Sequence, residues 1–70
     1  MSIEFRIETE QETDGRWIAE VPDLPGTLAY GASADQAITR VQALALRVVA
    51  ERLEQGKAGL EFLNIAFRAA

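Results

Sequence analysis

The sequence has 70 residues, enough for one small domain, and domains of this size bury only about 60% of the surface of the unfolded chain. It contains no Cys and no His, which excludes disulfides, thiolate and imidazole catalysis and most zinc sites. Residues 1–23 carry seven acidic and two basic side chains, a net charge of −5, while the remainder carries +1. An acidic first third repels phosphate, so we expect no direct DNA or RNA binding and favour a basic protein partner.

Two segments near the start alternate apolar and polar residues, the pattern of half-buried strands. They are residues 3–9 and 16–21, and the residues between them are typical of a hairpin turn. A two-residue loop would place glutamates on the same face as the apolar side chains. A three-residue loop pairs Glu12 with Arg16 and brings the two apolar sets onto one face, so burial favours it. We therefore expect Gly15 to adopt positive φ as a bulge in this longer loop.

Two prolines interrupt the chain after the hairpin. Pro22 and Pro25, followed by Gly26, predict a rigid connection, because proline cannot donate a backbone hydrogen bond within a central strand. A short third strand is expected over residues 27–30, ending before Gly31.

A long helix is the clearest predicted element. Ser33 and Gln36 have the spacing of a capping box, and Gly56 is a typical residue just beyond a helix end, so we expect a helix from Ser33 to about Gln55. Its apolar side spans about 200°, whereas covering one sheet face needs only about 100°. Either loops and the last strand cover the excess, or a second protomer does. The candidate interface residues are Leu46, Val49 and Leu53.

Residues 60–67 predict a final strand that is apolar on both faces. Such a strand is either covered on both sides or located at a subunit boundary, and its candidate interface residues are Leu63, Ile65 and Phe67. The element order is β-β-β-α-β, which predicts a single α+β domain over residues 1–70, with an antiparallel sheet packed by one long helix. We expect the chain to form a dimer or tetramer, because a core this small leaves little stability to spare.

The sequence offers little catalytic chemistry. Ser2 and Ser33 have no histidine to activate them, and strand alternation puts Glu8 and Glu10 on a solvated face. We therefore expect no catalytic residue, no cofactor, no metal site and no enzymatic activity. Trp17 is interpreted either as a core or rim packing residue or as an exposed binding anchor. No apolar run approaches about 18 residues and no leader pattern is present, so we expect a cytoplasmic protein that does not span a membrane.

One segment resembles the HicB family of antitoxins. The matching pattern is Asp14 and Gly15, then Trp17 and Ala19, and then the run from Pro22 to Gly26 that reads Pro-Asp-Leu-Pro-Gly. It continues with matches at Gly31, Ser33, Asp35 and Ala37, and the resemblance covers residues 3–55 approximately. The Pro-Asp-Leu-Pro-Gly run is quite specific when a hairpin precedes it and a capped helix follows it.

The resemblance implies a partial RNase H-like β-β-β-α-β fold and a role in a toxin–antitoxin system. Members of the family bind HicA, a small basic mRNA-cleaving toxin, and silence it by covering its active site, and they usually form dimers or higher oligomers. The candidate partner-binding residues in this chain are Glu8, Glu10, Glu12, Asp14, Trp17, Asp23 and Leu24. The turn residues Gly15, Pro22, Pro25 and Gly26 are expected to hold the backbone.

The chain also departs from the family. Full-length members generally carry a C-terminal DNA-binding module, and this sequence ends about three residues after its last predicted strand, so we expect no operator binding from it. Residues 60–67 are more apolar than the proline-containing segment often found after the family's helix. The alternative function is a solitary domain without a toxin, acting as an oligomeric scaffold or as a small-ligand binder.

Overall fold

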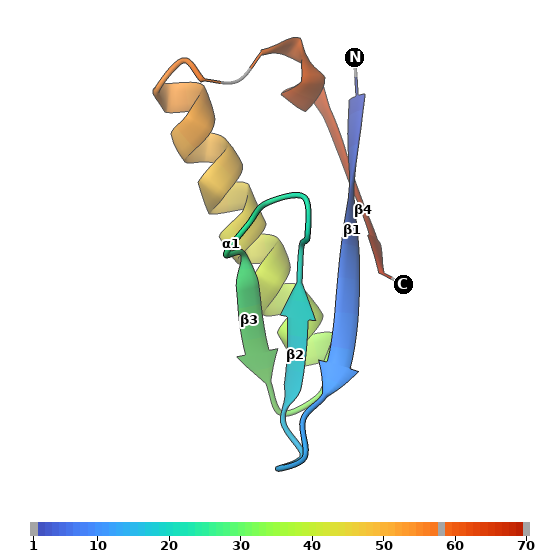
Figure 1. Cartoon of the computed structure of the whole chain (residues 1–70). Helices are drawn as coiled ribbons and strands as arrows, with labels where there is room; N and C mark the ends of the chain where they lie inside the picture. The colour runs from blue at the N-terminus through green and yellow to red at the C-terminus, as the bar shows by residue number, and fades with distance from the viewer. Residues whose placement is uncertain (1, 58, 70) are drawn as a thin grey trace.

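Four strands, one long helix and one short 3-10 helix make up residues 2–57 and 59–69, the part of the chain that this computed structural model describes (Figure 1). The elements, in chain order, are β1 (Ser2–Gln11), β2 (Trp17–Glu20), β3 (Leu28–Gly31), α1 (Ala34–Glu54), η1 (Leu60–Leu63) and β4 (Asn64–Ala69). A four-stranded sheet with one helix confirms the predicted α+β class.

The sheet is mixed rather than antiparallel, which corrects the prediction. Its strand order is β3-β2-β1-β4, with antiparallel pairing among β1, β2 and β3 but parallel pairing between β1 and β4. Figure 1 shows why: α1 carries the chain back to the end of the sheet where β1 begins, so β4 then runs in the direction of β1. A helical crossover of this kind is the usual connection to a parallel strand.

The hairpin has the predicted register. Thr9 lies opposite Ala19 and Gln11 opposite Trp17, so the apolar side chains of both strands share one face. The backbone N–H of Glu12 donates to the carbonyl of Arg16 at 2.7 Å, which closes a three-residue loop, and Gly15 has a φ of 93°. The sequence-based interpretation of this turn is therefore confirmed.

Replacing Gly15 with valine should lower the free energy of unfolding by about 1–2 kcal/mol, the cost of left-handed backbone for an L residue. No heavy atom lies within 4 Å of the position of an added Cβ, so strain and not collision causes the loss. Urea unfolding followed by the fluorescence of Trp17 measures it. Thr13→Val is the matched control, because it places the same valine in the same loop at a residue whose φ is not positive. Equal stability of the two variants would contradict the bulge.

Residues 22–26 form a tight connection that buries one side chain. The backbone N–H of Leu24 donates to Val21 at 3.0 Å, and the N–H of Thr27 donates to Leu24 at 2.9 Å. These bonds fold the segment back on itself, so Leu24 is only 2% exposed and belongs to the core. The third strand occupies Leu28–Gly31, one residue later than predicted at each end.

The helix ends are capped largely as predicted. The hydroxyl of Ser33 accepts from the backbone N–H of Gln36 at 3.1 Å. The side chain of Gln36 accepts from the N–H of Ala32 and not from that of Ser33, so the reciprocal half of the capping box is shifted by one residue. At the other end Gly56, with a φ of 69°, donates to Leu53, and the next residue donates to Arg52, the Schellman arrangement.

The last segment differs from its prediction. A single strand was expected over residues 60–67, but Leu60–Leu63 form a 3-10 turn and the strand covers Asn64–Ala69. The turn brings Phe62 against the core, where its ring lies 6.2 Å from that of Phe5. Packing of this ring against the core explains why the segment forms a turn, although its apolar alternation predicts a strand.

The core lies between α1 and one face of the sheet. Its fully buried residues come from β1, β2, the connection and the helix, and they are Phe5, Ile7, Ala19, Val21, Leu24, Ala37, Val41, Ala45 and Val49. Within the described residues, no helix is both long enough and apolar enough to cross a lipid bilayer. No helix of the described residues lies on the other face of the sheet, which leaves this face open for contacts (Figure 1).

Candidate protein-binding site

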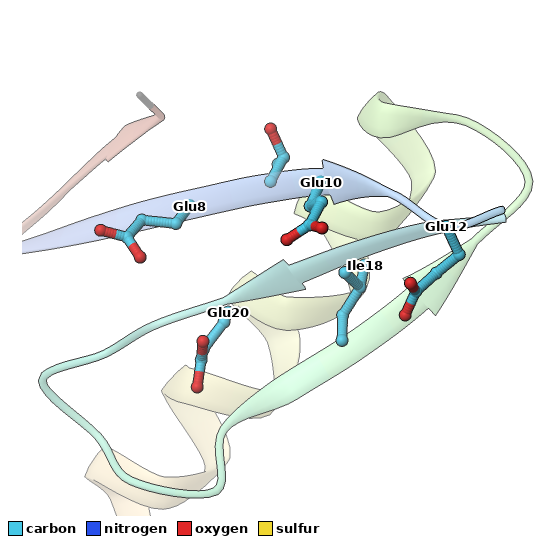
Figure 2. Close-up of a pocket in the computed structure, with 6 residues that line it drawn as sticks. Glu8, Glu10, Glu12, Ile18 and Glu20 are labelled. Atoms are coloured by element: carbon cyan, nitrogen blue, oxygen red, sulfur yellow. The ribbon is translucent and has the colours of Figure 1, made fainter.

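The open face of the β1–β2 hairpin carries a group of carboxylates around one apolar side chain. Because side chains alternate along a strand, the residues that flank the buried ones point away from α1. The register places Glu8 opposite Glu20 and Glu10 opposite Ile18. Figure 2 shows these side chains together with Glu12 on the same side of the hairpin. We call this surface, made of Glu8, Glu10, Glu12, Ile18 and Glu20, the acidic face.

The acidic face is poorly neutralised. In the described part of the chain the ion pair that reaches it is the contact of Arg6 with Glu8, at 3.4 Å. Glu10, Glu12 and Glu20 have no ion-pair partner among the described residues. Like charges directly opposite each other in a sheet are destabilising, by about 0.2–1 kcal/mol. A face that keeps such a pair, Glu8 and Glu20, exposed is suited to a cationic partner, which would relieve the repulsion.

The residues that line this face favour a protein partner over a small-molecule ligand. It surrounds an open hollow of about 560 Å³, a size that small-molecule sites also have. Those sites, however, are lined mainly by apolar and aromatic side chains, whereas four of the six residues that line this hollow are glutamates and the other two are Thr9 and Ile18. Among the residues that the structure describes, no group of three or more Asp, Glu, His or Cys is arranged to hold a metal ion.

An apolar row continues the acidic face onto β3. Tyr30 lies opposite Ile18, and Leu28 lies opposite Glu20, and both are 38% exposed. Neither residue was a predicted site residue, because the sequence did not indicate which strand would lie beside β2. The alternation of Leu28 and Tyr30 with Ala29 was the available signal. These side chains give the acidic face an apolar border, as protein interfaces commonly need.

Asp14 serves the hairpin rather than the acidic face. Its Oδ1 accepts from the backbone N–H of Arg16 at 3.0 Å, and its Oδ2 accepts from the Arg16 side chain at 2.8 Å. The backbone hydrogen bond first, and the side-chain bond after it, hold the pKa of Asp14 below its ordinary value. The Arg16 guanidinium also lies 4.7 Å from the centre of the Tyr30 ring. The negative charge of Asp14, which was predicted to contact a partner, is therefore largely neutralised by Arg16 of the same chain.

Two other predicted partner-binding residues contact the core or lie in it. Trp17 is half-buried and packs against the core cluster, as a core or rim packing residue would. Leu24 is buried, so its assignment to a partner-binding surface is wrong, and the cause is the folded-back connection described above. Asp23 is exposed in that connection and is not among the residues that line the hollow of the acidic face.

Some of the predicted self-association residues are likewise buried or half-buried, and the others are exposed. Val49 is 3% exposed and lies in the core, so its assignment to an interface is wrong; it faces the sheet together with Val41 and Ala45. Ile65 and Phe67 are half-buried against the core. Besides Leu28 at the border of the acidic face, four described leucines are exposed, and we call them the uncovered leucines: Leu46, Leu53, Leu60 and Leu63, exposed by 47%, 49%, 65% and 69%.

Comparison with protein-family models, with curated proteins and with solved structures finds no match to this chain.

Proposed function

We propose that the chain is a HicB-like, antitoxin-type protein-binding domain, which acts in the cytoplasm without enzymatic activity and neutralises a small basic HicA-like mRNA-cleaving toxin by covering it. The observation that carries this proposal is the acidic face: four glutamates around Ile18 on a sheet face that no helix of the described residues covers. The resemblance of residues 3–55 to the HicB pattern supports the choice of partner.

Electrostatics account for the choice of a basic partner. A surface of one sign attracts an oppositely charged protein at long range and raises the rate of association by about 10- to 1,000-fold. Proteins that cleave RNA must themselves carry positive charge to hold phosphates. An acidic face therefore occupies the same surface of the toxin that RNA needs. The apolar border at Leu28 and Tyr30 supplies contacts that orient the complex once it has formed.

The test is binding to the small basic protein encoded beside the gene for this chain. Changing Glu10, Glu12 and Glu20 to glutamine should slow association at least about tenfold and weaken its dependence on salt, because both effects come from long-range charge. Stopped-flow or surface-plasmon measurements at two salt concentrations give both quantities.

The control removes carboxylates at a distance from the acidic face. Glu51 and Glu54 are exposed near the end of α1, and their change to glutamine should leave the association rate within about twofold of the wild type. Equal slowing in both variants, or the absence of any neighbouring small basic protein that binds, would contradict the proposal.

We also propose self-association, to a dimer or tetramer, through the uncovered leucines. Leu46, Leu53, Leu60 and Leu63 are exposed by about half or more in the single chain, and covering them removes apolar surface from water. The same observation favours the second candidate function, a homo-oligomeric scaffold without a toxin. An oligomer whose mass stays unchanged when the basic neighbour is added would support the scaffold.

A further inference from the structure

The outer edge of β4 is open to another strand. In the described part of the chain β4 pairs with β1 alone, so it forms one edge of the sheet. It has six residues and no proline, and its one charged side chain, Arg68, is paired with Glu4 at 3.5 Å. Edge strands in monomeric proteins are usually protected by prolines, inward charges or covering elements. Within the described residues β4 has neither a proline nor a further strand on its outer side, and its single charge is neutralised by Glu4 of β1.

The opposite edge is better protected. β3 has four residues, and the side chain of Arg40 from α1 donates to the carbonyl oxygen of Tyr30 at 2.9 Å. A helix residue thus occupies a backbone acceptor of β3. Figure 1 shows α1 over β2 and β3, whereas β4 lies beyond β1. The two edges are therefore not equivalent, and β4 is the one available for pairing.

The molecule is more extended than a compact domain of its length, and exposed leucines lie next to β4. A compact domain of 70 residues has a radius of gyration of about 11 Å, whereas this chain has 12.7 Å and extents of 40 × 20 × 16 Å. Leu60 and Leu63, the two most exposed large apolar residues, directly precede β4. Apolar surface and open backbone groups therefore occur together at the same edge.

We propose that β4 pairs antiparallel with β4 of a second copy, about a twofold axis that passes through Ala66. In this register Ile65 lies opposite Phe67 of the second copy, on the face that the core occupies. Asn64 lies opposite Arg68 of the second copy, on the open face. A shift by one residue would bring Ile65 opposite Arg68 and mix the two faces, which burial opposes.

The occupant is a second copy because this edge is complementary to itself. A twofold axis requires that a surface match its own rotated image. The register through Ala66 uses most of the strand, keeps apolar residues together and leaves no two arginines opposite each other. The parallel pairing of β4 extends along β1 only as far as Ile7. Most of the acidic face lies beyond that residue, so both interfaces can be occupied together.

Charge at the axis residue tests this register. Ala66 is exposed, and a lysine there would lie opposite the lysine of the second copy. For each variant by itself, Ala66→Lys or Ala66→Glu, the dissociation constant of the dimer should be about fivefold higher than for the wild type, because two like charges then lie directly opposite each other. An equimolar mixture of the two variants should dimerise about tenfold more tightly than either alone. Sedimentation equilibrium of the full chain over micromolar concentrations measures all three.

The control is Ala32→Lys, which adds the same charge at an exposed residue between β3 and α1, at the sheet edge opposite β4, and should leave the dissociation constant unchanged. A monomer throughout the concentration range overturns the proposal, and so does a dimer that neither Ala66 variant weakens. If both variants weaken the dimer but their mixture fails to restore it, the register is wrong. This inference deepens the self-association part of the proposed function. Its failure leaves binding of the basic partner intact, since that binding is measured separately on the acidic face.

Discussion

Replacing Phe5 with alanine should lower the free energy of unfolding by about 3–5 kcal/mol, the usual loss for a buried phenylalanine. Phe5 is 1% exposed, and its ring lies 5.8 Å from that of Phe67 and 6.2 Å from that of Phe62. It therefore connects β1 to β4 and to η1, two elements that meet few other parts of the core. A domain of 70 residues has a total stability of only about 4–10 kcal/mol.

The measurement is urea unfolding monitored by Trp17 fluorescence, together with hydrogen exchange of the β4 amides. Exchange in β4 should accelerate more than exchange in β2, because the lost ring supports β4 directly. Ile7→Val is the control, since Ile7 is equally buried in the same strand and the change should cost only about 0.5–1.5 kcal/mol. Stability within about 0.5 kcal/mol of the wild type for Phe5→Ala would contradict the role given to this ring.

Replacing Gly31 with alanine should lower the free energy of unfolding by about 1–3 kcal/mol, the range seen for overpacked sites. An added Cβ at Gly31 would lie 2.5 Å from the backbone nitrogen of Ala37 and 3.0 Å from the backbone carbon of Gln36. The first turn of α1 thus lies directly on β3, and only a residue without a side chain permits this approach. Alanine would have to displace the helix, because backbone atoms cannot move aside independently.

Gly59→Ala is the matched control for this substitution. An added Cβ there would meet only the end of the Glu61 side chain, at 3.0 Å, which is flexible and can move. We expect its stability to stay within about 0.5 kcal/mol of the wild type, as for most surface changes. Thermal unfolding by circular dichroism compares the two variants. A smaller loss for Gly31→Ala than for Gly59→Ala would mean that α1 does not lie on β3 as described.

Local features of the fold could be predicted from the sequence. The hairpin register followed from apolar alternation and from Gly15, and the helix ends followed from Ser33 and Gly56. In each case the decisive residues lie within a few positions of one another. Turn geometry, capping and alternation act over such short separations, so they can be recognised without knowing where the rest of the chain lies.

The candidate site was predictable only in part. The glutamates of β1 were expected on an open face, because alternation decides which side of a strand is solvated. Leu28 and Tyr30 were missed, and Leu24 and Val49 were assigned to surfaces although they are buried. These errors share a cause: the exposure of an apolar residue depends on which element packs over it, and the sequence near the residue does not contain that information.

The sequence by itself determined the α+β class, the hairpin with its bulge, the capped helix and the concentration of negative charge in the first 23 residues. Only the tertiary structure decided that β4 pairs parallel to β1, that Phe62 turns inward before it, and that the acidic face is bordered by Tyr30. The physical reason is range. Pairing between residues some sixty positions apart, such as Ser2 and Asn64, depends on the path of the whole chain and on which sheet edge remains free.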